Sequence, residues 1–511
     1  MRILTSAEMA AVDRAAQRRE KIPSLLLMER AAEGVVELLC SRFPAANRIA
    51  LVCGPGNNGG DGLAAARLLA ARAVSPKIFL LGTAAGLSGD AAANLSKASE
   101  AGLEAVELPS RSGWNEFRFA VSSMDVIVDA LFGTGLSRPL TGLAKRTVET
   151  INSSNRPVVA VDVPSGVSGD SGELAGPSVR ADWTAAVAAL KRCHVLFPAR
   201  ERCGEIAVVD IGIPDRLLET KRHRFAVVPA EAIAPLFLPR PRDANKGDFG
   251  HVAVVAGSRG KAGAAMLCAL GALRAGAGLV TIACPESIEP RFTAALPEAM
   301  TLALPEQAGA LSDRAERPLL ALLENCTAAA VGPGLGTSRG TVRLVSAVVA
   351  RSAIPALFDA DALNAFPGRP EVFRRRKAAT ILTPHPGEAG RLLSKSTSEI
   401  QRSRPESAAE LARLSGAVAV LKGAGTLTAD PSGRTWWNPT GTPALAAGGS
   451  GDVLSGIGAS LLAQGFEAVD AAVAAVFVHG LAGERAAGGS DRGILASQVA
   501  SAIPGVLSSF G

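Results

Sequence analysis

The sequence predicts an α/β protein with two consecutive doubly wound domains. Short apolar runs recur through both halves of the 511 residues, and each is followed by a Gly-rich turn and a helical pattern. Such runs are typical of parallel strands that are buried on both faces and joined by crossover helices. The alternation stops once, in a basic stretch that contains four prolines, and then starts again.

The composition limits the class of protein. Hydrophobic residues make up 48% and charged residues 20%, which is typical of a globular chain with sizeable cores. Lysine and arginine exceed aspartate and glutamate by 53 − 47 = 6, a modest excess that suits phosphate-bearing small molecules as well as nucleic acid. Aromatic residues at 4%, with no tyrosine, disfavour an RNA reader built on ring stacking.

Cysteine usage and the N-terminus indicate the compartment. Seven scattered cysteines without a CxxC pair suggest neither a zinc site nor a disulfide framework, and they fit a reducing cytoplasm. Glu8, Asp13 and Arg14 stand where a signal peptide needs an apolar run. The longest apolar stretches fall short of the ~20 residues that cross a membrane. We therefore expect a cytoplasmic protein with neither nucleic acid nor membrane as a partner.

The first domain is expected at residues 1–214. Residues 5–8 form a capping-box pattern that opens an N-terminal helix, and a second helix is expected near 26–39. The predicted strands are 49–53, 77–81, 126–129 and 158–162, with further candidates at 183–189 and 206–209.

The second domain is expected at residues 246–511, after a basic, Pro-rich connection at 215–245. Its predicted strands are 251–255, 278–283, 328–331, 356–359, 379–383 and 417–421, and long Ala-rich helices follow. The two halves carry different motifs, so a fusion is indicated rather than a duplication.

A Gly-rich loop at residues 54–62, GPGNNGGDG, follows the first strand and opens a helix. Its glycines allow a tight turn, and the helix N-terminus offers free N–H groups to an anion. No acidic residue follows ~20 residues later, which disfavours an ordinary NAD-linked dehydrogenase, and no Gly-Lys-Ser/Thr follows, which excludes a P-loop. A plain strand-to-helix turn explains the glycines but not Asn57, Asn58 and Asp61.

Two more strand ends carry carboxylates. Asp129 begins DALFGTGL and Asp162 begins DVPSG, so both lie at the carboxyl edge of the sheet, where open α/β sheets bind ligands. A single aspartate there is often only a helix N-cap. Together with Asn58 and Ser165, these oxygens suit an alkali or alkaline-earth cation rather than zinc.

The second half ends in a glycine run, GGSGDVLSG, at residues 448–456. Glycine-rich backbone at a helix N-terminus can stabilise a transferring phosphoryl group, and Asp452 in the first turn can accept a proton from an attacking hydroxyl. The simpler interpretation is an aspartate favoured by the helix dipole. Three further segments, at residues 332–336, 385–388 and 422–426, each follow a predicted strand. Their positions favour a nucleotide-binding site.

Together these motifs resemble those of the bifunctional NAD(P)H-hydrate repair enzymes, in which an epimerase domain is fused to an ADP-dependent dehydratase domain. The matching segments include 4–9, 27–31, 54–62, 129–136, 162–166, 245–251, 274–280, 332–336, 385–388, 422–426 and 448–456. The resemblance implies a Rossmann-like three-layer α/β/α domain followed by a ribokinase-like α/β domain.

The resemblance also implies residue roles. In the epimerase domain the hydrate would contact Asn57, Asn58, Gly59, Gly60, Asp61, Gly133, Thr134, Gly135, Leu136, Ser137, Arg138, Pro139 and Asp162. A potassium ion would be held by Asn58, Asp129 and Ser165. In the dehydratase domain the hydrate would contact Ala277, Gly336, His385 and Asp452, and ADP with Mg²⁺ would contact Lys422, Gly423, Ala424, Gly425, Thr426 and Gly451.

The implied chemistry is repair of hydrated nicotinamide cofactors. Asp162 is the candidate base that opens and recloses the hydrated ring, which interconverts R- and S-NAD(P)HX. Asp452 is the candidate base for ADP-dependent dehydration of the S form to NAD(P)H, with release of AMP and phosphate. The expected partners are NADHX, NADPHX and ADP, and we expect a homo-oligomer.

Two alternatives stay open at this stage. The second domain alone has features of a ribokinase-like kinase that phosphorylates a vitamin alcohol, although HPGE and KGAGT speak against it. The first domain is, in the other alternative, a non-catalytic binding module, which the intact Asn-Asn-x-x-Asp set disfavours.

Overall fold

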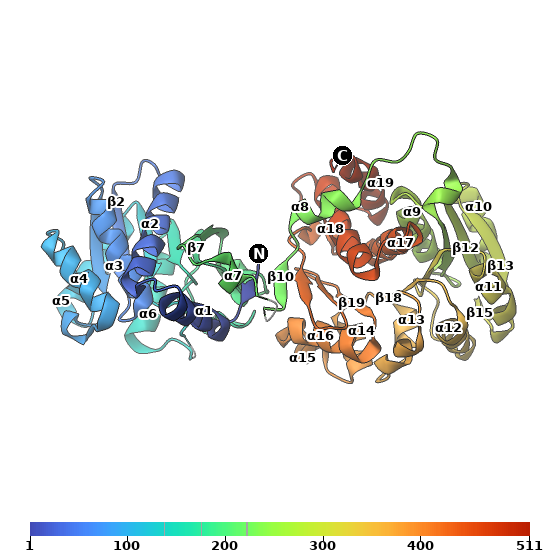
Figure 1. Cartoon of the computed structure of the whole chain (residues 1–511), viewed down its shortest axis with the longest axis horizontal. Coiled ribbons are helices and arrows are strands. Elements are labelled where there is room, and N and C mark those ends of the chain that lie inside the picture. The colour runs from blue at the N-terminus through green and yellow to red at the C-terminus, as the bar shows by residue number, and fades with distance from the viewer. Residues whose placement is uncertain (137, 175, 221–222, 511) are drawn as a thin grey trace. The chain divides into compact units, whose positions relative to one another are not determined.

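A computed structural model describes residues 1–511 except 137, 175, 221–222 and 511. The chain divides into two compact units, Met1–His223 and Arg224–Gly511 (Figure 1). The division falls inside the stretch 215–245 that the sequence predicts as a connection. That stretch contributes α7 (Asp215–Leu218) to the first unit and β10 (Phe225–Val227) and α8 (Ala230–Ile233) to the second.

Within the described part of the first unit, seven parallel strands form one sheet in the order β4-β3-β2-β5-β6-β7-β9. These strands are β2 (Arg48–Cys53), β3 (Ser75–Leu80), β4 (Ala105–Glu107), β5 (Val126–Ala130), β6 (Val158–Val161), β7 (Trp183–Val187) and β9 (Glu205–Val209). The strands predicted from the sequence are confirmed to within a few residues, and β4 was not predicted.

Helices cover both faces of this sheet, as a three-layer fold requires. They are α1 (Ser6–Arg19), α2 (Ser24–Arg42), α3 (Asn57–Ala70), α4 (Gly89–Glu100), α5 (Arg111–Ala120) and α6 (Gly142–Ser153). Successive side chains of a strand point to opposite faces, so Leu51 packs with α1, α2 and α3 while Val52 packs with α5 and α6. Near-continuous apolar strands fit this arrangement because neither face meets water.

The N-terminal residues are tied to the far end of the same unit. β1 (Ile3–Leu4) pairs in parallel with β8 (Leu190–Lys191), and Leu4 lies opposite Lys191. Thr5 and Glu8 then form the predicted capping box, in which the Thr5 hydroxyl accepts the Glu8 N–H and the Glu8 carboxylate accepts the Thr5 N–H. The β1–β8 pairing and the capping box together fix where α1 begins.

Among the described residues of the second unit, ten strands form a sheet in the order β10-β21-β20-β19-β18-β17-β16-β11-β12-β13. The strands are β11 (His251–Val255), β12 (Leu279–Pro285), β13 (Met300–Leu304), β16 (Ala328–Val331), β17 (Ala356–Phe358), β18 (Thr380–Leu382), β19 (Val418–Leu421), β20 (Leu427–Ala429) and β21 (Thr435–Trp437), besides β10. Only the β19–β20 and β20–β21 pairs of this sheet are antiparallel. A small hairpin pairs β14 (Glu306–Gln307) with β15 (Ala310–Leu311).

The helices of the second unit surround this sheet. They are α9 (Ala262–Arg274), α10 (Glu289–Ala295), α11 (Glu316–Leu323), α12 (Arg339–Arg351), α13 (Asp361–Asn364), α14 (Pro386–Leu393), α15 (Thr397–Arg402), α16 (Arg404–Ser415), α17 (Ser450–Ala463), α18 (Ala468–Ala487) and α19 (Ala496–Leu507). Within the described ranges, no helix combines the length and the apolar character that a membrane span requires.

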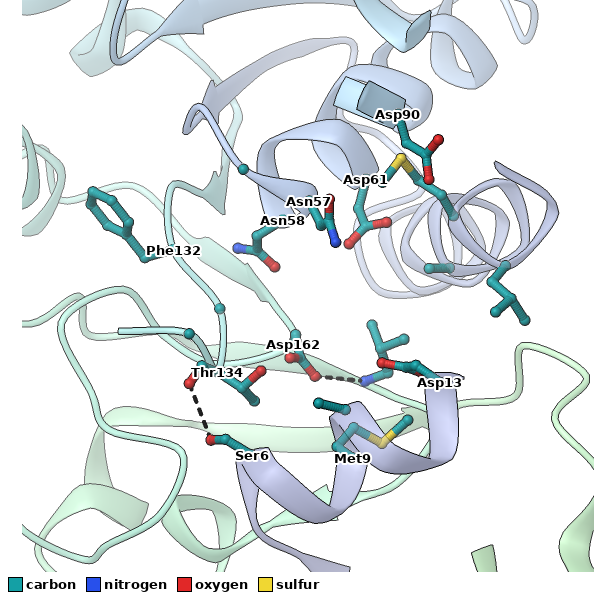
Figure 2. Close-up of a pocket in the computed structure, with 18 of the residues that line it drawn as sticks. Ser6, Met9, Asp13, Asn57, Asn58, Asp61, Asp90, Phe132, Thr134 and Asp162 are labelled. Atoms are coloured by element: carbon teal, nitrogen blue, oxygen red, sulfur yellow. Dashed lines mark hydrogen bonds between the residues drawn. The ribbon is translucent and has the colours of Figure 1, made fainter. Parts of the chain in front are cut away.

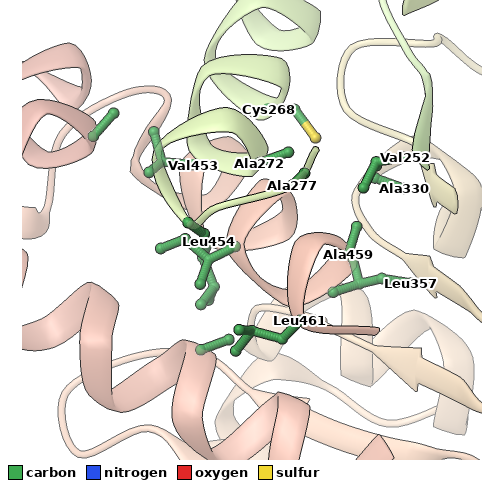
Figure 3. Close-up of a cluster of buried hydrophobic side chains, with 14 of the residues drawn as sticks. Val252, Cys268, Ala272, Ala277, Ala330, Leu357, Val453, Leu454, Ala459 and Leu461 are labelled. Carbon is green, nitrogen blue, oxygen red and sulfur yellow. The ribbon is translucent and has the colours of Figure 1, made fainter. Parts of the chain in front are cut away.

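Helices α9 and α17 pack closely at the centre of the second core (Figure 3). A Cβ on Gly456 would lie 2.0 Å from the carbonyl oxygen of Cys268, and one on Gly271 would lie 2.5 Å from that of Val453. Only glycine leaves room for such an approach. This contact sets the position of α17, whose first turn carries Asp452.

Candidate active sites

A cavity of about 850 Å³ opens at the carboxyl edge of the sheet in the first unit (Figure 2). The loops after β2, β5, β6 and β7 line it, together with α1 and α2. The predicted residues that line it are Asn57, Asn58, Asp61, Gly133, Thr134, Gly135, Leu136, Arg138 and Asp162. The carboxyl-edge location is the one that the strand-end aspartates predicted.

Three predicted contacts of this cavity are not among its lining residues. A Cβ on Gly59 would lie 1.8 Å from the carbonyl oxygen of Gly54, and one on Gly60 would lie 2.7 Å from the sulfur of Met28. These glycines thus let α3 approach its own loop and α2. Pro139 is also outside the lining, and Ser137 lies outside the described residues.

Asp162 is held at the cavity wall by a buried lysine. The Lys191 side chain is 1% exposed, and its ammonium pairs with the Asp162 carboxylate and donates to the Val187 carbonyl oxygen at 2.6 Å. Asp162 has a φ of 64°, an uncommon value for a residue other than glycine. A strained backbone and a paired carboxylate together aim this side chain into the cavity.

His194 completes the support behind this pair. Its Nε2 donates to the Asp162 carbonyl oxygen at 2.9 Å, and its Nδ1 accepts the Lys191 N–H at 3.0 Å. Burial lowers the pKa of His194 to about 3, so the ring is neutral. The ring nitrogen and the Cys193 and Cys203 sulfurs lie within 4.8 Å of one another, but both ring nitrogens are already hydrogen-bonded. This cluster therefore supports Asp162 rather than a metal.

Asp90 also lines the cavity, and so do Asp13 and Asp61, the two carboxyl groups whose pKa values are raised. Burial raises the pKa of Asp61 well above its usual range, and nearby Asp162 and Asp13 raise it further. Burial also raises the pKa of Asp13 to about 6. Neither carboxyl group makes a hydrogen bond or an ion pair with the described residues, in contrast to Asp162. Asp13 and Lys191 were not predicted as site residues from the sequence.

Asp129 and Ser165 form a buried oxygen cluster beside the cavity. The Ser165 hydroxyl donates to Oδ1 of Asp129 at 2.6 Å, and the Ser165 N–H donates to Oδ2 at 2.8 Å. Both residues are 0% exposed, and burial raises the pKa of Asp129 to about 6. The Phe132 N–H donates to Ser165, while the Leu131 N–H donates to Oδ1 of Asp129 at 3.3 Å, so the carboxylate also caps the start of the turn that follows β5.

This oxygen cluster fits a hard cation. No lysine, arginine or histidine in the described part of the unit pairs with Asp129, and a buried carboxylate is costly unless a charge or a metal balances it. Asn58 is also buried, and a Cβ on Gly133 would lie 3.2 Å from its Oδ1. Carboxylate, amide and hydroxyl oxygens are the ligands that such cations take.

In the second unit, the ends of β17 and β19 bring Asp359 and Lys422 together with Ser455 of α17. Lys422 Nζ lies 2.6 Å from Oδ1 of Asp359, and the Ser455 hydroxyl donates to Oδ2 at 2.8 Å. Glu388 lies 3.9 Å from the same ammonium. Asp359 and Glu388 raise the pKa of Lys422 despite its burial, so the group stays cationic.

Asp452 lies in the same neighbourhood and is half-buried. Burial raises its pKa to about 7, and the negative charge of Asp359 adds to the effect. His385 begins α14 as a cap, where its Nδ1 accepts the Gly387 N–H at 3.0 Å and its own N–H donates to Glu388. Gly336 N–H donates to Asp361 at 2.7 Å. The predicted residues Gly336, His385, Lys422 and Asp452 therefore belong to one edge of the sheet.

The glycine-rich segments reach the same edge. Residues 422–426 follow β19, and the Thr426 hydroxyl donates to the Gly423 carbonyl oxygen at 3.0 Å. A Cβ on Gly451 would lie 3.5 Å from Lys422 Nζ, so Gly451 brings the start of α17 beside that ammonium.

Comparisons with known proteins decide the family. The NAD(P)H-hydrate dehydratase model matches residues 252–505, and the model of the YjeF-related protein N-terminus matches 24–193. The bifunctional NAD(P)H-hydrate repair enzyme of Moorella thermoacetica is 41% identical, over 99% of this chain and 97% of the relative. That of Escherichia coli is 36% identical, over 93% and 88%.

The chain belongs to the bifunctional NAD(P)H-hydrate repair enzyme family. It is accordingly an enzyme, and neither a vitamin kinase nor a non-catalytic binding module describes it. The solved ADP/ATP-dependent NAD(P)H-hydrate dehydratase of Bacillus subtilis, co-crystallised with ATP and Mg²⁺, is 32% identical with a TM-score of 0.51. It covers 56% of this chain and 99% of its own, and the predicted fold class is confirmed.

One residue implied by the family resemblance lies apart from the others. Ala277 precedes β12, whereas Gly336, His385 and Lys422 follow β16, β18 and β19. Since these strands are parallel to one another, Ala277 lies at the opposite edge, a strand length of roughly 15 Å away. It is 8% exposed and belongs to the hydrophobic core around α17 (Figure 3). The structure therefore corrects its placement in the substrate site.

Proposed function

We propose that the first unit interconverts the R and S hydrates of NADH and NADPH, and that the second unit dehydrates the S hydrate with ADP. The observation that carries this proposal is one oriented acidic group in each unit. Asp162 faces the first cavity, held by Lys191, and Asp452, with a pKa raised to about 7 by burial, lies near Lys422. A carboxylate close to its pKa at neutral pH is suited to general base catalysis.

In the first unit, Asp162 accepts the proton of the hydroxyl on the hydrated ring carbon. The bond from that carbon to the ring nitrogen breaks, the carbon becomes an aldehyde and the nitrogen gains a proton. Closure on the opposite face of the aldehyde reverses these transfers and inverts the centre. The α3 N-terminus, with Asn57 and Asn58, binds the pyrophosphate end through its free N–H groups.

The potassium ion belongs to this first site. Asn58, Asp129 and Ser165 would hold it, because their oxygens are buried and hard and the Asp129 charge has no cationic side chain within the described residues. When bound, the ion offsets negative charge from Asp129 and from the substrate pyrophosphate. Ring opening and closure are the work of the protein's carboxyl groups.

In the second unit, Asp452 accepts the proton of the hydroxyl as its oxygen attacks the β-phosphoryl group of ADP, and AMP leaves. The carbon–oxygen bond then breaks and phosphate leaves with the bonding electrons. The neighbouring ring carbon loses a proton to solvent, which forms the double bond of NADH or NADPH. Lys422 and the glycine-rich backbone at 423–426 and 451 neutralise the charge of the phosphoryl groups. Gly336 and His385 would contact the hydrate.

Magnesium accompanies the nucleotide in this proposal. The carboxylates of Asp361 and Glu388 lie beside Gly336 and Lys422, and carboxylate oxygens together with phosphates are the ligands that Mg²⁺ takes. When bound, the ion supplies charge neutralisation at the phosphates. Lys261, 3.3 Å from Asp361, adds a positive charge at the same edge.

The deciding experiment uses the purified full chain and a mixture of both NADH hydrates. With ADP and Mg²⁺, we expect complete recovery of the near-ultraviolet absorbance of NADH. Recovery that stops when the S hydrate is exhausted would contradict the epimerase role of the first unit. Accumulation of a stable phosphorylated product would contradict the dehydratase role. We also propose a cytoplasmic homo-oligomer, for which light scattering of the purified chain measures the mass.

A further inference from the structure

The N-terminal segment forms one wall of the first cavity. The model of the YjeF-related protein N-terminus matches only from residue 24, yet Ser6, Met9 and Asp13 line the cavity (Figure 2). The Ser6 hydroxyl donates to the Thr134 carbonyl oxygen at 3.1 Å, and β1 pairs with the strand that carries Lys191. This segment therefore belongs to the site, not only to the fold.

Asp13 is presented to the cavity by a helix that the core holds in place. Its neighbours Val12 and Ala16 on α1 are 4% and 0% exposed and pack in the first hydrophobic core. Asp13 itself is half-buried, and Figure 2 shows its carboxyl group turned toward the same space as those of Asp61 and Asp162. The backbone is fixed, while the carboxyl group makes no hydrogen bond or ion pair within the part of the chain that the structure describes.

The charges around Asp13 explain why its carboxyl group has no ion pair among the described residues. Lys191, from another element, acts on Asp13 through its positive charge, but its ammonium is engaged by Asp162 and the Val187 carbonyl oxygen. Asp162 and Asp61 face Asp13 with like charge, and Arg14 is its neighbour on α1. Helix α7 also packs on α1, where its Arg216 pairs with Glu20.

The epimerisation proposed above needs two proton-transfer groups. Asp162 takes the hydroxyl proton, and a second group must give a proton to the ring nitrogen as the carbon–nitrogen bond breaks. Two of the three ammonium protons of Lys191 are directed to Asp162 and to the Val187 carbonyl oxygen, which leaves at most one for that step. A free carboxyl group on another wall of the cavity meets the requirement.

We propose that Asp13 is this second group, so that the N-terminal helix supplies the catalytic acid of the epimerase site. The carboxylic acid of Asp13 gives its proton to the ring nitrogen during opening, and its carboxylate takes the proton back during closure. This inference rests on the proposed function of the first unit. Asp61 is the competing candidate in the same cavity, where burial and the nearby Asp162 and Asp13 raise its pKa, and the Asp61→Asn variant below separates it from Asp13.

The test compares variants of the full chain in direct epimerisation of a single purified hydrate, without ADP. We expect Asp13→Asn to lower the turnover at least ~100-fold with little change in hydrate affinity, and Asp13→Glu to retain part of the rate. Arg18→Gln, on an exposed position of the same helix, should match the unmodified chain. Thermal unfolding and dehydration of the S hydrate monitor folding and should stay unchanged in every variant.

The pH profile separates an acid from a structural residue. The unmodified chain should show a limb with an apparent pKa near 6, because burial raises the pKa of Asp13 to about that value, and Asp13→Asn should lack this limb. Turnover of Asp13→Asn within threefold of normal, or reduced turnover with the limb retained, overturns the inference. Loss of epimerisation in Asp61→Asn alone assigns the acid to Asp61 instead. If the unmodified chain does not epimerise, the proposed function itself fails.

Discussion

Lys422 Nζ lies 2.6 Å from Oδ1 of Asp359, a carboxylate that is 1% exposed. The second oxygen of Asp359 accepts the Ser455 hydroxyl at 2.8 Å. One buried carboxylate thus joins the end of β17, the end of β19 and the helix that carries Asp452. The groups proposed to bind phosphate and to accept the hydroxyl proton are positioned relative to each other by this residue.

Asp359→Asn should therefore weaken both stability and nucleotide binding. It leaves the Lys422 ammonium short of its closest counter-charge in a buried setting, which costs about 3–5 kcal/mol in the free energy of unfolding. Calorimetry gives the stability, and titration with ADP gives the affinity. Asp313→Asn is the matched control, because its pair with Arg343 is about half exposed and should contribute at most ~1 kcal/mol.

Asp452→Asn tests the base of the dehydratase. We expect the dehydration rate to fall at least ~100-fold, with epimerisation unchanged because it belongs to the other unit. The base acts as a carboxylate, and burial raises the pKa of Asp452 to about 7. In the unmodified chain the rate should thus rise with pH up to about 7 and then level off. A variant with near-normal turnover would remove Asp452 from the mechanism.

Asp162→Asn tests the base of the epimerase. Starting from hydrate enriched in the R form, conversion to NADH should stall once the S form is consumed, apart from slow spontaneous inversion. Complete conversion at the normal rate would mean that Asp162 has only a structural role, and Lys191 would then be the next candidate base. The substitution also removes the ion pair with buried Lys191, so thermal unfolding of this variant should be measured in parallel.

Asp129 should make the stability of the first unit depend on pH and on potassium. Burial raises its pKa from 3.8 to about 6, so the native state holds this proton more tightly than the unfolded chain. The stabilisation is complete below about pH 4 and is lost as the pH rises to about 6, by about 3 kcal/mol. Potassium should reduce this loss, whereas sodium or lithium of equal ionic strength should do so less.

Asp129→Asn is the reference for that measurement. It should remove the potassium effect and the share of the pH dependence that comes from Asp129, while the share from the raised pKa values of Asp13 and Asp61 remains. An unmodified chain whose stability in this pH range does not respond to potassium would contradict the cation site. Asp129→Ala should in addition weaken binding of the hydrate.

The alternation of apolar runs and Gly-rich turns was enough to predict most strands of both sheets. Burial on both faces makes a parallel strand a short continuous run, which is visible in one sequence. Strands β4, β10 and β13 were missed, and each lies at an edge of its sheet. All three are partly exposed, so they lack the continuous buried apolar run that marks a central parallel strand.

The residues of the candidate sites likewise include some that the sequence predicted and some that it did not. Strand-end motifs predicted Asp162 and Lys422, because a parallel sheet brings its carboxyl ends to one edge. A glycine run at a helix N-terminus predicted Asp452. Asp359 also ends a predicted strand, so its position could have predicted a role in the site, but it was not predicted as a site residue. Asp13 gave no sign, since an aspartate on a polar helix face is ordinary.

The sequence by itself determined the two-domain α/β architecture, the family and most residues at the sheet edges, because these depend on local pattern and on motifs within short segments. Only the tertiary structure decided which groups meet across the chain: Leu4 with the strand of Lys191, Asp13 with the cavity, and Asp359 with Lys422 and Ser455. It also placed Ala277 in the core. Contacts between distant segments arise from packing and burial, which no local pattern encodes.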